Sequence, residues 1–198
     1  EFEDGVVIAS SSKESDPDLL WNGYFDFALI GASWDRRCTA ITRCNSIDIG
    51  FATEIVPDET ESVKLLDIHH GLIVKFLSRS CNNFCTIKSK TENLSETLVK
   101  VRESLWTAIG NRDRKQSARI IIDITTCPRY FTLAILCEAF RSGLCGEIVI
   151  AYSAGMYPSP KPSYGDLEEI SFTDGSFHAV PIPGYFGEFE PSKTSFFM

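Results

Sequence analysis

Long apolar runs and an excess of basic charge are both missing from this chain. No apolar run approaches the roughly 18 residues that a helix needs to cross a bilayer. The stretch 1–18, EFEDGVVIASSSKESDPD, is acidic where a secretory signal would be basic. The 19 Lys and Arg residues are outnumbered by 27 Asp and Glu, for a net charge of −8. We therefore expect a cytoplasmic protein with no membrane partner and no global electrostatic attraction to duplex nucleic acid, although a local basic patch fits on an acidic body.

Standard cofactor and metal motifs are missing as well. No G-x-G-x-x-G or Walker sequence occurs, which counts against a standard dinucleotide or ATP site. The seven cysteines are an odd number, and several lie inside apolar patterns, so we expect reduced thiols that act as small hydrophobes. Cys81 and Cys85 have a metal-like spacing, but no second Cys/His pair with zinc spacing follows. We expect no metal and no cofactor.

What the chain does have is a regular alternation of apolar runs and helical patterns. Its composition, 43% hydrophobic and 23% charged, is in the globular range. The expected strands are 25–33, 47–56, 84–89, 117–126 and 147–155, and the expected helices are 34–44, 57–80, 91–110 and 128–143. The helix over 91–110 is the clearest, with apolar residues three or four apart, and Trp106 is expected in its core-facing stripe.

Buried strands that alternate with helices predict a parallel sheet covered on both faces. With right-handed crossovers, this gives an α/β fold of the Rossmann-like, doubly wound type, with a mainly parallel five-stranded sheet, over residues 25–155. Residues 1–24 are expected to be a lead-in segment. Residues 156–198 are rich in Pro and Gly and form an irregular extension with short strand-like stretches, or the start of a truncated second domain.

The densest polar cluster, residues 123–129, follows the most hydrophobic strand. In a doubly wound sheet, ligands bind beyond the carboxyl ends of the strands. Pro128 fits the first helical position, so the free N–H groups of that first turn and the helix dipole favour an anion. Thr125 and Thr126 supply hydroxyls, and Arg129 supplies a planar fork suited to phosphate or carboxylate. These residues predict a phosphate-recognising site.

Two plainer interpretations of the same stretch stay open. Thr126 and its neighbours are able simply to cap the helix, while Asp123 pairs with Arg129 across the turn. Cys127, at a helix N-terminus near an arginine, is also a candidate for a reactive thiol.

A second polar cluster favours the ligand site over capping alone. The stretch 33–37 also ends an apolar strand and opens a helix, and doubly wound order places it next to 123–129. A third contribution comes from the end of the fifth strand. The predicted ligand-binding residues are Ser33, Trp34, Arg36, Arg37, Asp123, Thr125, Thr126, Arg129 and Ser153.

Here the sequence resembles a known family. Asp123, Thr125 and Arg129 match a signature that follows the fourth strand of CARF domains, the CRISPR-associated Rossmann fold: an acidic or amide residue, a hydroxyl residue two positions on, and a basic residue four positions after that. The family also tends to close its first strand with a small polar residue, where this chain has Ser33. The resemblance covers roughly residues 25–155.

The resemblance implies a homodimeric sensor of a prokaryotic defence system that binds a cyclic oligonucleotide, of the oligoadenylate type, or another phosphate-bearing small molecule. It would pass the signal to an effector protein or a fused effector domain. This chain carries no evident effector and no R-x(4–6)-H nuclease motif. A small nucleotide-processing hydrolase and a non-binding scaffold domain of a defence complex stay open as alternatives.

Overall fold

The computed structural model of the chain describes residues 23–44, 46–58, 63–110 and 117–153. The strands are β1 (Gly23–Gly31), β2 (Ile47–Pro57), β3 (Cys81–Ser89), β4 (Ala118–Asp123) and β5 (Cys145–Ala151). The helices are the 3-10 helices η2 (Arg36–Arg43) and η3 (Thr91–Asn93) and the α-helices α1 (Val63–Ser80), α2 (Leu94–Ile109) and α3 (Arg129–Ser142). The predicted extension over 156–198 lies outside the described residues.

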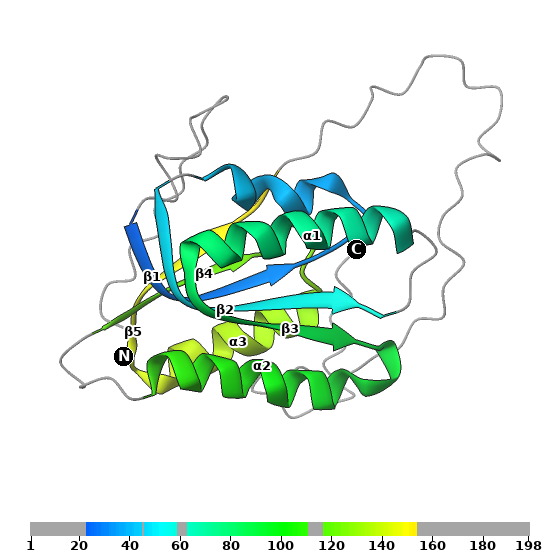
Figure 1. The fold of residues 1–198 in the computed structure, drawn as a ribbon. Helices are drawn as coiled ribbons and strands as arrows, with labels where there is room; N and C mark the ends of the chain where they lie inside the picture. The colour runs from blue at the N-terminus through cyan, green and yellow to red at the C-terminus, as the bar shows by residue number, and fades with distance from the viewer. Residues whose placement is uncertain (1–22, 45, 59–62, 111–116, 154–198) are drawn as a thin grey trace, which may run out of the picture.

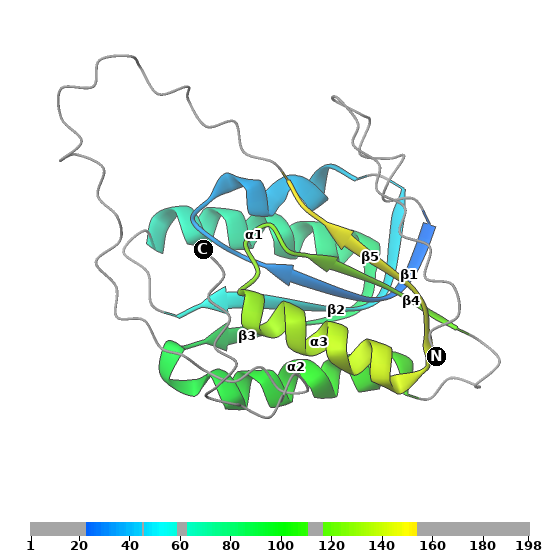
Figure 2. The same cartoon turned by 180° about the vertical axis from the view of Figure 1, so that it is seen from behind.

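The strands join in one sheet of order β3-β2-β1-β4-β5, and every pair of neighbours is parallel (Figure 1). The helices α1 and η2 cover one face, while α2 and α3 cover the other (Figure 2). The predicted Rossmann-like α/β class is therefore confirmed. The chain leaves β1 on one side toward β2 and returns on the other as β4, so the topological switch point lies between β1 and β4.

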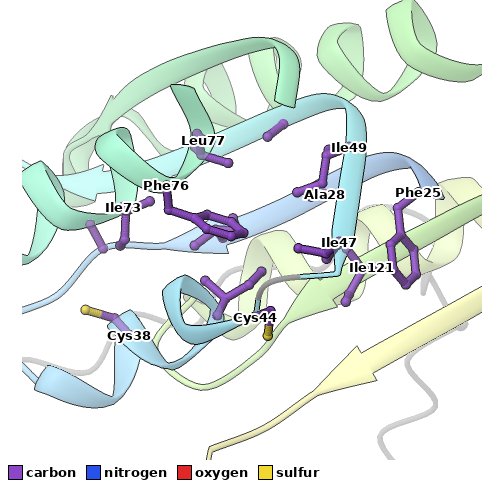
Figure 3. Packing of buried hydrophobic residues seen from close by; sticks show 14 of the residues in the cluster. Phe25, Ala28, Cys38, Cys44, Ile47, Ile49, Ile73, Phe76, Leu77 and Ile121 are labelled. Atoms are coloured by element: carbon purple, nitrogen blue, oxygen red, sulfur yellow. The ribbon is translucent and has the colours of Figure 1, made fainter. Parts of the chain in front are cut away.

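Strand alternation sends the apolar residues of the sheet into two cores. On the α1 face, Ala28 and Ile121 of the sheet pack with Ile73 and Phe76 of α1 (Figure 3). On the other face, buried residues of the sheet such as Leu29 pack with residues of α2 and α3. Continuous apolar runs in β1 and β4 are needed because both of these strands are covered on both faces.

Several boundaries differ from the sequence-based expectation. Pro57 ends β2 and does not open the following helix. The stretch after β1 forms the 3-10 helix η2 and not an α-helix, and its N-cap is Asp35, whose side chain accepts a hydrogen bond from the Arg37 amide. Strand β3 begins three residues earlier than predicted, at Cys81, and β5 ends at Ala151. These differences do not change the order of the elements.

The prediction that Trp106 lies in the core is wrong. The core-facing stripe of α2 consists of Leu98, Val101, Leu105 and Ile109, and Trp106 lies on its flank. Its indole Nε1 donates a hydrogen bond to Glu138 Oε1 of α3 at 2.9 Å. A Trp with one polar atom fits such a boundary position, because the ring contacts apolar surface while the N–H meets an acceptor.

Helix α1 is apolar on more than one face. Its buried residues include Ile73 and Phe76, whereas Leu65, Ile68 and Leu72 are largely exposed. Apolar residues on both faces blur the helical period, so the spacing alone does not identify the buried face of this helix.

No helix in the described part of the chain is long and apolar enough to cross a membrane.

Candidate functional site

The loops that follow β1 and β4 meet directly, as the sequence predicted. Thr126 Oγ1 donates a hydrogen bond to the Gly31 carbonyl oxygen at 2.6 Å, across 95 residues of sequence. Gly31 has no side chain to interfere, and a Cβ there would lie 2.6 Å from the backbone Cα of Cys127. The absence of a side chain at residue 31 therefore lets the β4–α3 loop pack against the end of β1.

The turn after β4 is organised by its own polar groups. The Asp123 carboxylate is buried, and its Oδ1 accepts a hydrogen bond from the Thr125 amide at 2.9 Å. The Thr125 hydroxyl oxygen accepts another from the Ser153 amide at 2.9 Å. The ends of β1, β4 and β5 are thus joined by hydrogen bonds through Thr125 and Thr126. Asp123 lies beneath this turn and shapes it.

Helix α3 begins with Arg129, and its N-cap is Pro128, one residue from the predicted register. The N-cap residue makes no side-chain cap hydrogen bond, and the Thr126 hydroxyl bonds to Gly31, so the capping interpretation of Thr126 is wrong. Arg129 is exposed, and within the described residues it forms no ion pair with Asp123 or any other carboxylate. At this helix end the Phe131 amide already bonds to the Pro128 carbonyl, and the exposed Arg129 side chain adds a guanidinium.

The loop after β1 has a different arrangement. The Arg37 side chain forms a close ion pair with Asp35, with Nε 2.8 Å and Nη2 2.6 Å from Asp35 Oδ2. Hydrogen bonding to Arg37 lowers the pKa of the Asp35 carboxyl. Trp34 and Arg36 are exposed, and the Ser33 hydroxyl accepts a hydrogen bond from the Asp35 amide. Arg36 therefore keeps its charge available at this edge, while Arg37 is already paired.

An open groove of about 610 Å³ runs from the β4–α3 turn along α3 and the edge of β5, and we call it the α3 groove. Its lining residues are Arg37, Ile124, Thr125, Thr126, Cys127, Pro128, Arg129, Thr132, Leu133, Leu136, Ile150 and Tyr152. Four predicted site residues line it: Arg37, Thr125, Thr126 and Arg129. The other five predicted site residues are close in sequence to lining residues but do not line the groove themselves: Ser33, Trp34, Arg36, Asp123 and Ser153.

Thr132 lines the α3 groove with a buried hydroxyl that has no hydrogen-bond partner within the described residues. The hydroxyl lies close enough to the Cys127 thiol to affect its pKa, but a thiol is a weak partner. Desolvation raises the pKa of Cys127 to about 12. The thiol therefore stays protonated at neutral pH, and the arrangement does not support a reactive Cys127.

The buried Asp123 carboxyl gives a prediction about stability and pH. Desolvation raises its pKa above the ordinary value of 3.8, so ionisation is less favourable in the folded than in the unfolded state. The resulting cost is present above the raised pKa and disappears as the pH falls toward 3.8. We expect Asp123→Asn, which keeps an oxygen for the Thr125 amide, to raise the free energy of unfolding at neutral pH, and this gain should shrink in acid.

Urea titrations at neutral pH and at about pH 4 measure this effect. The control is Asp48→Asn, which removes the same charge from an exposed position in β2. If Asp123→Asn gained the same stability at both pH values, the gain would not come from removing the buried carboxylate charge.

Sequence reasoning missed a second polar cluster, on the α1 face of the sheet. Glu54 of β2 is fully buried and contacts His70 of α1 and Thr86 of β3. His69 contacts the backbone carbonyl of Ser33. The available signal was a glutamate inside the apolar strand IGFATEIV, since a buried charge needs partners. Within the described residues, no group of three or more His, Cys, Asp or Glu side chains is arranged to hold a metal ion.

Comparison of the chain with protein-family models, curated proteins and solved structures finds no match.

Proposed function

We propose that this chain binds a phosphate-bearing small molecule in the α3 groove, with a cyclic oligonucleotide as the ligand class. The observation that carries the proposal is the composition of this one groove at the topological switch point. Arginine and threonine side chains line the end near the β4–α3 turn, and Leu133, Leu136, Ile150 and Tyr152 line the rest. A nucleotide is divided in the same way, because its phosphate is charged and its base is planar and largely apolar.

The phosphate would be held at the N-terminus of α3. The first amides of this helix have no side-chain cap, and a helix N-terminus carries a partial positive charge of about half a unit. Arg129 adds an exposed guanidinium that no carboxylate of the described chain neutralises. Arg36 is a second exposed cation at the neighbouring loop. Together they favour a dianionic or polyanionic ligand.

The remainder of the ligand would lie along α3 and β5. Tyr152 offers an aromatic face for stacking. The Thr125 hydroxyl is already engaged at both ends, because its oxygen accepts from the Ser153 amide and its side chain hydrogen-bonds the Asp123 carboxyl. The Thr126 hydroxyl already donates its hydrogen to the Gly31 carbonyl, so toward a ligand it is able only to accept. In this proposal Asp123 positions the turn and does not touch the ligand.

The sensor role rests on the resemblance of Asp123, Thr125 and Arg129 to the CARF signature. In that role the chain is part of a prokaryotic defence system, acts as a homodimer, and transmits ligand occupancy to an effector. Light scattering on the purified chain, with and without ligand, tests the homodimer separately from binding.

Replacing Arg129 by Ala tests the binding proposal. We expect affinity to fall by about 10- to 100-fold, because a charge-assisted hydrogen bond contributes about 1.5–3 kcal/mol. The thermal midpoint should stay unchanged, because the side chain is exposed. Calorimetric titration with a panel of cyclic and linear oligonucleotides measures the affinity.

The matched control is Arg79→Ala, which removes the same charge from an exposed position at the end of α1, outside the lining of the α3 groove. If no member of the panel binds the wild-type chain, the ligand class is wrong. If a ligand binds and Arg129→Ala binds it as tightly as wild type does, the location is wrong.

A further inference from the structure

Glu54 is a charged residue at a position that its strand otherwise fills with apolar side chains. In β2 it lies on the same face as Ala52 and Val56, and both of these residues belong to the core on the α1 face. Its side chain is 0% exposed, and both of its carboxylate oxygens are used. Oε1 lies 2.8 Å from His70 Nδ1, and Oε2 accepts a hydrogen bond from Thr86 Oγ1 at 2.9 Å. Burying this group is costly unless both oxygens find donors, and here they do.

The contact with Glu54 is made by Nδ1 of the His70 ring. Where the carboxylate is the acceptor of this contact, the proton belongs to Nδ1. In the neutral ring, Nε2 then carries the lone pair. The His70 side chain is 34% exposed. In the described part of the chain, the buried side-chain atoms without a hydrogen-bond partner do not include His70 Nε2. The contact at Nδ1 thus holds the ring in place while part of the ring stays accessible to solvent.

His69 provides an internal comparison. Its Nδ1 lies 2.8 Å from the Ser33 carbonyl oxygen, which also only accepts, so His69 has the same tautomer. It differs in two respects: its hydrogen-bond partner is neutral, with the Asp35 carboxylate acting on the ring only through space, and the residue is 8% exposed. Of the two adjacent histidines, only His70 combines a direct contact to a carboxylate with access to solvent.

We propose that Glu54, Thr86 and His70 form a second chemical site, in which His70 Nε2 is a general base toward water or an alcohol hydroxyl. The O–H bond of the water or alcohol breaks, an N–H bond forms at Nε2, and the Glu54 carboxylate balances the imidazolium charge. Thr86 holds the other carboxylate oxygen, so Glu54 cannot rotate away from the ring.

This site is separate from the α3 groove. Glu54 and His70 lie on the face of the sheet that α1 covers, whereas the groove lies beside α3 on the opposite face. The inference rests on the contacts of Glu54 alone and does not depend on the proposed ligand. A chain that binds no oligonucleotide would still carry it.

Nitrogen-15 NMR of the full chain at a pH where the ring is neutral tests the first part. We expect Nδ1 of His70 to bear the proton and Nε2 to be unprotonated, as in His69. Finding the proton on Nε2 of His70 would overturn the proposal, and this measurement needs no variant.

Carbethoxylation by diethyl pyrocarbonate, located by mass spectrometry, tests the reactivity of Nε2. We expect His70 to react several-fold faster than His69. In Glu54→Gln, whose amide oxygen can still accept from Nδ1, the His70 rate should fall several-fold because the negative charge is gone. Thr86→Val, which leaves that charge in place, should keep the rate. Equal rates for His69 and His70, an unchanged rate in Glu54→Gln, or an equal loss in Thr86→Val would each refute the role of the carboxylate.

Discussion

Gly31→Ala is expected to destabilise the domain by about 3 kcal/mol, the upper part of the usual range for forcing extra atoms into a packed interior. The new methyl group would lie 2.6 Å from both the Cα and the amide nitrogen of Cys127. These are backbone atoms, so no flexible side chain can move aside. The β4–α3 loop would have to shift away from β1, and the hydrogen bond from Thr126 to the residue 31 carbonyl would lengthen or break.

Gly71→Ala is the matched control for this substitution. Gly71 lies inside α1, and a Cβ there would meet nothing within 4 Å. Alanine should therefore stabilise the helix, by about 1 kcal/mol, because it restricts the unfolded chain without a clash. Urea unfolding midpoints measure both variants. Opposite shifts for the two Gly→Ala changes are the expected result, and a wild-type midpoint for Gly31→Ala would mean that the two loops are not in close contact.

Phe131→Ala is expected to cost about 3–5 kcal/mol, as for other buried aromatic residues cut back to alanine. Phe131 is 0% exposed and belongs to the core between the sheet and the helices α2 and α3. It is the third residue of α3, so it also fixes the start of this helix, where Arg129 and Thr132 face the α3 groove. We expect a lower urea midpoint together with weaker ligand binding.

The same helix supplies the control. Phe140 is 63% exposed, so Phe140→Ala removes an identical side chain at a cost within about 0.5 kcal/mol. Comparable losses at residues 131 and 140 would show that the burial pattern of α3 is wrong.

The order of the elements and the meeting of two loops followed from the sequence because each rests on a local pattern. Apolar runs such as 120–122 identify buried strands, and doubly wound topology then places the first and fourth strands side by side. The contact between Thr126 and Gly31 is a consequence of that placement. Alternation of elements is thus enough to locate the edge of the sheet where a ligand site is expected.

The finer details depend on partners that are distant in sequence. Trp106 follows the helical period closely enough to look buried, yet the acceptor Glu138 on α3 places it at the boundary. Glu54 meets His70 and Thr86 across 16 and 32 residues, and no spacing rule links them. Pro57 illustrates a local ambiguity: proline opens helices but also fits the end of a strand, and here it ends β2.

The central position of β1 has a consequence for how the chain acquires its structure. Its pairing with β4 and the contact from Asp26 to the Arg119 amide join residues 93 positions apart. Loops of that length are costly to close, and long-range pairing of parallel strands is intrinsically slow. During synthesis, the first three strands must wait with one side of β1 uncovered until the fourth emerges from the ribosome.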